Sequence, residues 1–317
     1  TYHWRVHPVN GSWSSLSSFS TQETSVSTFT DVDAVYIDPL IYNPELSLDG
    51  ITIYGIMDPY YSAAINIEGK EIWNSNQYMF LNMKDNKDFF ANSTFGNETE
   101  REFGVQFTFE DDIIWHEPRI HGADENLNFL QHELIKLPNG NYIGLVPIFF
   151  DRYIPHSSHY PELEDIEYEF YFQETFFGND PEKLCEWKAE KIVEWDSQGI
   201  EKWSWSPNNQ EYGYNLNDFN EFNYWWEPGK NICSTDPFEW THFNAIAYDE
   251  NDSSVYVSSK NLSRITKINY NTKEIIWNLG ANLRWWEDLD LNHIIFGNSG
   301  QHGLQILPNG NIVTFDN

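Results

Sequence analysis

The chain has 317 residues, of which 40% are hydrophobic and 17% aromatic, so it can bury a core in one large domain or two ordinary ones. Its 18 Lys plus Arg residues against 49 Asp plus Glu residues give a formal charge of -31, which repels nucleic acids and anionic membrane surfaces. This charge predicts that the protein has no nucleic-acid partner. There is also no apolar run of about 18 residues, so the sequence predicts no membrane span.

Residues 1–40 are rich in Ser and Thr and less regular than the rest, which predicts an N-terminal strand pair or a small β cap. From residue 41 onward, short runs of aromatic and β-branched residues alternate with Asn, Asp and Gly turns, and helical periodicity is scarce. We therefore expect an all-β fold in which residues 41–317 form the main domain. The acidic and aromatic segment 151–232 is expected to hold long loops.

Two series of hairpins recur along this domain. One series places a polar turn between two strands and contains "ELSLDGITIYG", "ELIKLPNGNYIGLV", "AIAYDENDSSVYVSS" and "LQILPNGNIVTFDN". The other ends in a strand that carries Trp and contains "INIEGKEIWN", "VEWDSQGIEKWSW" and "ITKINYNTKEIIWNLG". Repeated four-stranded sheets of this kind predict a six-bladed β-propeller of about 50 residues per blade, with a β-sandwich array as the rival.

One phrase occurs twice, as "QHELIKLPNGN" from Gln131 and as "QHGLQILPNGN" from Gln301. Pro-Asn-Gly supplies the fixed φ and the positive φ of a tight turn, so each phrase predicts strand, turn, strand. His132 and His302 hold the same place in the two phrases, and His242 precedes a third strand-turn-strand unit. Because innermost propeller strands surround one channel, we expect these three imidazoles to face a common cavity.

The sequence resembles the arylsulfotransferase family, the bacterial-type aryl-sulfate sulfotransferases that form six-bladed propellers. The resemblance is strongest over about 130–145 and 240–317 and is fainter from "ELSLDGITIYG" to "KEIWNS". It is carried by "WTHFN" at Trp240, "SSKNLSRITKI" at Ser258, "EIIWNLG" at Glu274 and "FGNSGQHGLQILPNGNIVTFDN" at Phe296.

This resemblance implies transfer of a sulfuryl group from an aryl sulfate donor to a phenolic acceptor, without a nucleotide or other cofactor. His302 matches the nucleophile that would become a sulfohistidine. His242 and His132 match two further active-site histidines, which would protonate the leaving phenoxide and hold sulfuryl oxygens, and Asn244 is a candidate for positioning or substrate binding. A neutral imidazole is a competent nucleophile near neutral pH.

Lys260 marks a departure from the family pattern, because relatives carry an arginine after the paired serines. Lysine keeps the charge but loses the planar fork that grips two oxygens at once. Glu133, Gly303 and Ala245 are further departures, and Arg264 is a candidate substitute from a neighbouring position. A noncatalytic extracellular propeller, acting as a binding or structural subunit, therefore stands beside the enzyme as an alternative, with a sulfatase-like hydrolase as a smaller third.

Other candidate sites are weaker. His156 and His159 have metal-ligand spacing without a helix to align them, "WHEPRIHG" reads as a loop with structural histidines, and "YDENDSS" lacks the ligand order of a calcium loop, so we predict no metal. The cluster "NYWWEPGK" and the pair Trp285 and Trp286 suit blade packing better than a substrate entrance.

The acidic surface suits an extracytoplasmic setting, periplasmic or secreted. Cys185 and Cys233 permit one disulfide, and glycosylation sequons begin at Asn10, Asn92, Asn97, Asn251 and Asn261. The chain starts without a signal peptide and stops where a strand is running, so we expect a processed chain with further C-terminal sequence. A homo-oligomer is possible.

Overall fold

The structure is a computed structural model, and every regular element that it describes is a β-strand. None of the residues that the structure describes forms a helix long and apolar enough to cross a lipid bilayer. The described residues are 2–4, 17–19, 50–57, 60–67, 69–75, 78–84, 88–94, 102–108, 112–118, 132–153, 184–214, 237–280, 293–295 and 300–316.

The chain divides into two compact units, Thr1–Ile114 and Trp115–Asn317. Their boundary falls inside the range 41–317, for which the sequence predicts one domain. The predicted boundary near residue 40 lies outside the described residues, so the division into 1–40 and 41–317 stays a prediction.

The first unit contains two small antiparallel sheets and a strand pair. Phe107 lies in the core of the unit, where its ring stacks on Tyr78 at a centroid distance of 4.5 Å. The strands are β1 (Tyr2–Trp4) with β2 (Ser17–Phe19); β3 (Thr52–Met57), β4 (Tyr60–Ile65) and β5 (Glu71–Ser75); and β6 (Tyr78–Lys84), β7 (Asp88–Thr94), β8 (Glu102–Phe107) and β9 (Ile113–His116).

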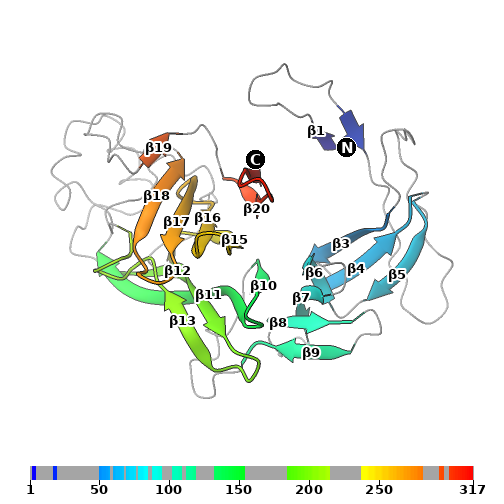
Figure 1. Cartoon of the computed structure of the whole chain (residues 1–317), viewed down its shortest axis with the longest axis horizontal. Helices are drawn as coiled ribbons and strands as arrows, with labels where there is room; N and C mark the ends of the chain where they lie inside the picture. Colours follow the sequence, from blue (N-terminus) through cyan, green and yellow to red (C-terminus); the bar gives the residue numbers. More distant parts are fainter. Residues whose placement is uncertain are drawn as a thin grey trace. The chain divides into compact units, whose positions relative to one another are not determined.

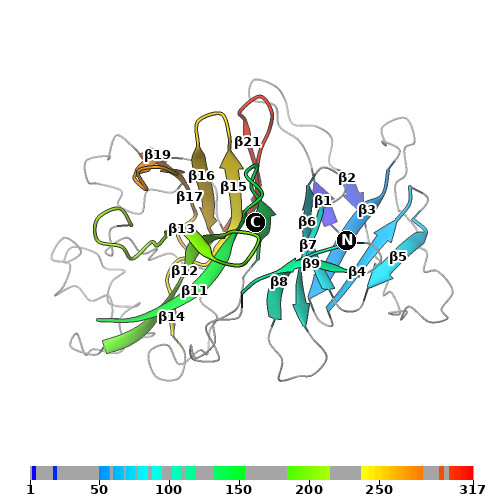
Figure 2. The same cartoon turned by 60° about the horizontal axis from the view of Figure 1, so that its bottom comes forward.

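The second unit contains two complete four-stranded antiparallel meanders and a separate two-stranded hairpin (Figures 1 and 2). Two short strands, β14 (Phe238–Glu239) and β19 (His293–Ile295), add in parallel to β12 and β18. The meanders are β10 (Leu134–Lys136), β11 (Tyr142–Tyr153), β12 (Leu184–Trp195) and β13 (Glu201–Trp205), then β15 (Phe243–Asp249), β16 (Ser254–Ser259), β17 (Arg264–Asn269) and β18 (Ile275–Gly280), and the hairpin is β20 (His302–Ile306) with β21 (Ile312–Phe315).

Both series of predicted hairpins are confirmed wherever they fall on described residues. The Trp-bearing series forms β4–β5, β12–β13 and β17–β18, and the other forms β10–β11, β15–β16 and β20–β21. Sequential four-stranded meanders are the blades of a propeller. The all-β, propeller-type fold is therefore confirmed, and the number of six blades stays a prediction.

The repeated phrase forms the same turn in both places. Gly140 and Gly310 have φ values of 87° and 80°, and each donates its N–H to the carbonyl of the leucine three residues earlier, at 2.9 and 2.8 Å. The register also repeats, since Ile135 pairs with Ile143 and Gln305 with Val313. A residue with a Cβ would be strained at either glycine.

Aromatic side chains fill the space between the two complete meanders. Trp187, Trp205 and Trp240 are fully buried, and Trp187 packs against Trp240 at a centroid distance of 5.8 Å. The sequence predicts blade packing for a different set of aromatic residues, and that prediction stays untested. The cluster "NYWWEPGK" and Trp285 with Trp286 lie outside the described residues.

Glu194 joins the repeated turn to the neighbouring meander. This buried carboxylate of β12 accepts hydrogen bonds from the Nδ2 atoms of Asn139 and Asn141, at 3.2 and 2.6 Å, and from the hydroxyl of Tyr270, at 2.6 Å. Burial and this bond to Glu194 raise the pKa of Tyr270, so Tyr270 remains a donor.

Replacing this carboxylate should destabilise the protein. We expect Glu194→Ala to lower the free energy of unfolding by about 3 kcal/mol, because three donors lose a charged acceptor. Urea unfolding of the variant beside Glu211→Ala, a change at an exposed glutamate, measures the difference. Equal stabilities for the two variants would show that the Glu194 network contributes nothing.

The structure describes one of the two cysteines and three of the five sequons. Cys185 is buried and disulfide-bonded, and Cys233, the other cysteine of the sequence, lies outside the described residues. Among the sequons, Asn92 and Asn261 are each only 2% exposed, so a glycan at either would need local unfolding. Asn251 is exposed in a turn and is the accessible described sequon.

Candidate functional site: a histidine cluster

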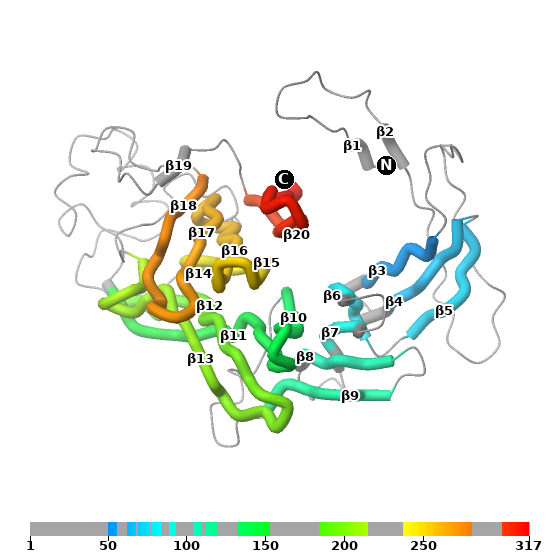
Figure 3. Tube along the Cα trace, in the orientation of Figure 1, coloured from blue at the N-terminus to red at the C-terminus, as the bar shows by residue number. Residues whose placement is uncertain are grey.

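The three predicted histidines sit where the first strands of successive sheets begin. His132 comes two residues before β10, His242 directly precedes β15, and His302 is the first residue of β20. These strands lie at the inner ends of their sheets within the second unit (Figure 3). Each imidazole therefore occupies an equivalent position, at the start of the first strand of its sheet.

The backbone at this point is unusual and differs between the repeats. His132 and His242 adopt left-handed conformations, with φ of 62° and 48°, whereas after His302 it is Gly303 that has a positive φ, 64°. Left-handed backbone is uncommon and costly for residues with a Cβ, and it gathers at functional sites. The two copies of the phrase therefore form the same turn, but the backbone conformation at the histidine differs between them.

The three imidazoles lie close enough to influence one another. The rings of His132 and His242 meet edge to face at a centroid distance of 5.0 Å. Burial, and after it the charges of His242, His302 and Lys188, lower the pKa of His132 to about 3. His132 is consequently neutral in the cluster at ordinary pH.

His302 is set up as a neutral imidazole by its surroundings. Burial lowers its pKa; a hydrogen bond from its ring to the Gly300 carbonyl opposes this, while the charges of Lys260 and His242 lower the pKa further. Since one ring nitrogen donates to that carbonyl, the other carries a lone pair. The ring nitrogen that does not bind the Gly300 carbonyl is therefore the one that can act as a nucleophile.

A buried glutamine and Asn244 fix the chain on the N-terminal side of His302. Gln301 is fully buried, and its Nε2 donates to Ser258 Oγ at 2.9 Å and to the carbonyls of Ser259 and Arg264 at 3.1 and 3.0 Å. Asn244 Nδ2 donates to the Gln301 carbonyl at 2.7 Å. Asn244 thus lies where it can position His302, and its proposed substrate contact stays a prediction.

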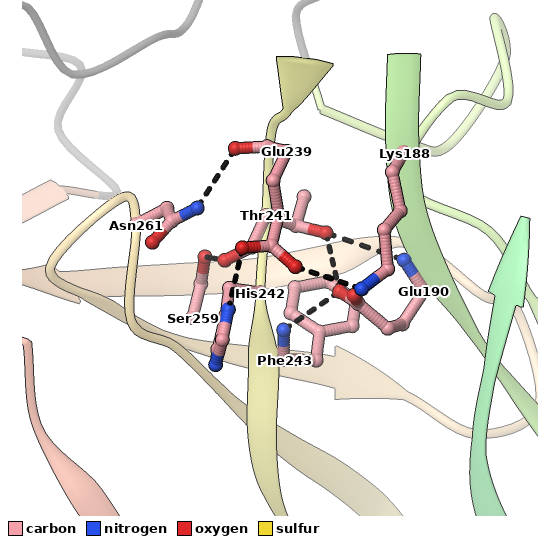
Figure 4. Close-up of polar contacts among 8 residues, drawn as sticks. All are labelled: Lys188, Glu190, Glu239, Thr241, His242, Phe243, Ser259 and Asn261. Atoms are coloured by element: carbon pink, nitrogen blue, oxygen red, sulfur yellow. Dashed lines mark hydrogen bonds and ion pairs between the residues drawn. The ribbon is translucent and has the colours of Figure 1, made fainter. Parts of the chain in front are cut away.

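His242 stands in a network of charged groups (Figure 4). Its Nδ1 lies 2.9 Å from Glu239 Oε2, an ion-pair distance without the straight geometry of a hydrogen bond, and Lys188 Nζ lies 2.8 Å from Glu239 Oε1. Although burial opposes ionisation, the interactions with His242 and Lys188 hold the pKa of Glu239 below its usual range. Glu239 is therefore an anion that lies between Lys188 and the His242 ring.

Glu190 holds the left-handed backbone at His242 from the other side. Its Oε2 accepts hydrogen bonds from the Phe243 N–H, at 2.7 Å, and from Thr241 Oγ1, at 2.8 Å. Burial raises the pKa of this fully enclosed carboxyl group, although Lys188 and the Phe243 bond oppose the effect. Both neighbours of His242 are thus anchored to β12.

The two basic residues of the "SSKNLSR" segment have different surroundings. Lys260 lies in the turn after β16, where its N–H donates to the His242 carbonyl at 3.0 Å and its charge acts on His302. Arg264 is 3% exposed, with its guanidinium 5.1 Å from the centre of the Tyr214 ring. Lys260 is thereby placed near the nucleophile candidate, and Arg264 in the packing between sheets.

The remaining candidates from the sequence fall only partly on described residues. In the described part of the chain, no three His, Cys, Asp or Glu residues are grouped to hold a metal ion. Asp249 accepts from Asn251, and Asp252 pairs with Lys267, so these acids of "YDENDSS" have protein partners. His116 Nδ1 bonds to the Glu117 carbonyl, while His121, His156 and His159 lie outside the described residues.

Lys188, Glu190, Glu239 and Gln301 are site residues that the sequence analysis missed. Signals for them existed: Lys188 and Glu190 are charged residues within the largely buried strand "LCEWKAEKIVEW", and the glutamine recurs at Gln131 and Gln301 beside each histidine. Buried charged residues are rare unless they have partners. The partners, however, come from other strands and required the structure.

The low pKa of His132 should make stability depend on pH. The ordinary histidine pKa is about 6.5, so below pH 6.5 the unfolded chain binds a proton that the folded His132 does not. The stability of the folded state is therefore unaffected by His132 above pH 6.5 and declines as the pH falls toward 3. Between pH 7 and pH 5 we expect wild type to lose about 2 kcal/mol that His132→Asn does not lose. Urea titrations at both pH values, with exposed His116→Asn as control, measure this difference. Parallel losses in wild type and His132→Asn would contradict the assignment.

Together, the sheets and the cluster define a propeller-type β protein with converging histidines at the inner ends of its blades. The family model for arylsulfotransferase (ASST) matches residues 58–317, and the chain belongs to this family. No curated protein matches the chain by sequence.

Similarities to solved structures are distant. A protein of unknown function from Bacteroides caccae has 10% identity and a TM-score of 0.40, with 84% of this chain and 65% of that one covered. BamB from Moraxella catarrhalis has 8% identity and a TM-score of 0.34, with 84% and 58% covered. The quinohemoprotein alcohol dehydrogenase ADHIIG from Pseudomonas putida HK5 has 10% identity and a TM-score of 0.29, with 70% and 35% covered. The chain spans less than two thirds of each, and no function is taken from them.

Proposed function

We propose that this protein is an aryl-sulfate sulfotransferase that passes a sulfuryl group from a phenolic sulfate ester to a phenol through a sulfohistidine at His302. Membership of the arylsulfotransferase family supports the reaction class. The observation that carries the proposal is the convergence of His132, His242 and His302 from three successive sheets.

In the first half-reaction, the unprotonated nitrogen of His302 attacks the ester sulfur. An N–S bond forms while the S–O bond to the aryl group breaks, and the phenoxide leaves with the electron pair of that bond. His242 gives the phenoxide a proton, so the first product is a phenol. The lowered pKa of His302 supports this role, because it keeps the lone pair available near neutral pH.

In the second half-reaction, an acceptor phenol gives its proton back to His242 and its oxygen attacks the sulfur. The N–S bond then breaks and returns the electron pair to His302. Lys260 and neutral His132 face the negative charge on the sulfuryl oxygens, the former by its charge and the latter by an N–H. No other reactant is needed for the atoms and charges to balance.

We further propose that the protein works outside the cytoplasm, in the periplasm or after secretion. The disulfide at Cys185 and the acidic composition support this location, since disulfides persist in oxidising compartments. Fractionation of the source cells, with immunodetection of the chain, tests it. Recovery in the cytosol with Cys185 reduced would contradict it.

Steady-state kinetics tests the reaction itself. With p-nitrophenyl sulfate as donor and phenol as acceptor, we expect phenol-dependent release of p-nitrophenol, formation of phenyl sulfate and parallel double-reciprocal plots. Release that needs only water would identify a hydrolase. Absence of release from the folded chain, over several pH values and aryl sulfates, would favour the noncatalytic propeller.

A further inference from the structure

The charged groups around His242 make more contacts than the pairing of the strands requires. A single carboxylate, that of Glu239, is divided between two partners, with Oε1 facing Lys188 and Oε2 facing the His242 ring. Lys188 and Glu239 are also register partners in the parallel pairing of β12 with β14. The strand pairing therefore fixes where the carboxylate stands relative to the imidazole.

The backbone of this segment is held as firmly as the side chains. The Glu239 carbonyl accepts from Asn261 Nδ2 at 2.7 Å, and the Thr241 carbonyl accepts from Ser259 Oγ at 2.6 Å. With Glu190 on the Phe243 N–H, the chain on either side of His242 has fixed partners. Only the side-chain torsion angles of His242 then remain free, and a carboxylate that binds Nδ1 can fix them.

We infer that Glu239, held in place by Lys188, is a positioning residue that fixes the His242 imidazole with Nδ1–H toward the carboxylate and Nε2 free to exchange a proton with the reacting oxygen. In Figure 4 a dashed line joins the Nδ1 atom of His242 to Glu239, and the second ring nitrogen lies farther from that carboxylate. The inference rests on the proposed function for the identity of the reacting oxygen. The orientation itself does not depend on that function.

An anion at Nδ1 has two chemical consequences for His242. It selects the tautomer with hydrogen on Nδ1, so that the lone pair of the neutral ring lies on Nε2. It also stabilises the imidazolium form that donates a proton to a leaving phenoxide. Of the charged groups around the ring, Glu190 acts in the same sense, while His132 and His302 act against it when they are positive. Lys188, on the other oxygen of Glu239, also acts against it.

Kinetics of three variants, measured beside two matched controls, tests the inference in the full chain. Glu239→Gln keeps the size and removes the charge, Glu239→Asp keeps the charge on a shorter stem, and Lys188→Met releases the carboxylate. The matched controls are Glu201→Gln and Lys191→Met, because Lys191 and Glu201 form an exposed pair at 3.6 Å in the same sheet.

We expect Glu239→Gln to lower kcat about 100-fold with little change in KM, and Glu239→Asp to recover part of the loss. The alkaline limb of the kcat/KM profile should shift to lower pH in Glu239→Gln, because the imidazolium form loses its anion. Lys188→Met should lower kcat to a smaller extent, and the controls should match wild type. Wild-type kcat and an unshifted pH profile in a folded Glu239→Gln protein would overturn the inference.

A second readout separates this inference from the proposed function. In protein labelled with ¹⁵N-histidine, the His242 resonances, assigned by comparison with His242→Gln, report which ring nitrogen carries the hydrogen. We expect Nδ1–H in wild type and loss of that preference in Glu239→Gln. If wild type transfers no sulfuryl group but shows this result, the proposed function fails and the positioning role stands; an Nε2–H ring in wild type overturns the positioning role whatever the activity.

Discussion

The His302→Ala variant should fold normally and lose sulfuryl transfer. We expect phenol-dependent release of p-nitrophenol to fall by about a thousandfold or more, because alanine leaves no nucleophile and the ping-pong route cannot begin. His302 is only partly buried, and the hairpin of β20 and β21 is held by its backbone pairing, so the fold should tolerate the change. Steady-state assays beside circular dichroism check both parts.

The control for this variant is His116→Ala, which removes an exposed histidine outside the cluster. Its activity should equal that of wild type. If folded His302→Ala retained more than a tenth of wild-type transfer, another group would be the nucleophile, and His132 or His242 would have to be tested in its place.

The second large effect is expected at Lys260. Its charge lowers the pKa of His302, and we propose that it also faces the sulfuryl oxygens, so Lys260→Met should remove both effects. We expect kcat to fall about 100-fold and the acid limb of the pH profile to move to higher pH, because His302 then binds a proton more readily. Measurement of kcat/KM from pH 5 to pH 9 should show a larger loss at pH 6 than at pH 8.

Lys260→Arg is the matched variant, since it keeps the charge and supplies the planar fork that the family resemblance predicts at this position. It should keep the acid limb near that of wild type and preserve transfer. A Lys260→Met protein with unchanged kcat and pH profile would mean that Lys260 does not act on the reacting groups.

Much of the fold could be predicted from the sequence because its signals are local. The Pro-Asn-Gly turns, the alternation of buried and exposed residues and the strands that end in Trp each lie within about ten residues. The repetition of one phrase with the same turn at Gly140 and Gly310 then indicated sheets of one kind. The number of blades is a global property, and local patterns do not determine it.

The candidate site was predictable only in part for the same reason. His132, His242 and His302 stand out because they share a place in a repeat, and the structure brings them together. Glu239 and Lys188 were not predictable, because their role comes from the parallel pairing of β14 with β12 across about 50 residues of sequence. The repeat also concealed a difference, since the positive φ falls on His132 in one copy and on Gly303 in the other.

The central claim is that His302 carries the sulfuryl group. Intact-protein mass spectrometry after brief mixing with p-nitrophenyl sulfate, with no acceptor present, tests it most directly. The account predicts a mass gain of one sulfuryl group together with a burst of p-nitrophenol, mapped to His302 by peptide analysis at neutral or alkaline pH and discharged when phenol is added. A protein that transfers sulfuryl groups without ever forming this adduct, or forms it equally in His302→Ala, would contradict the account.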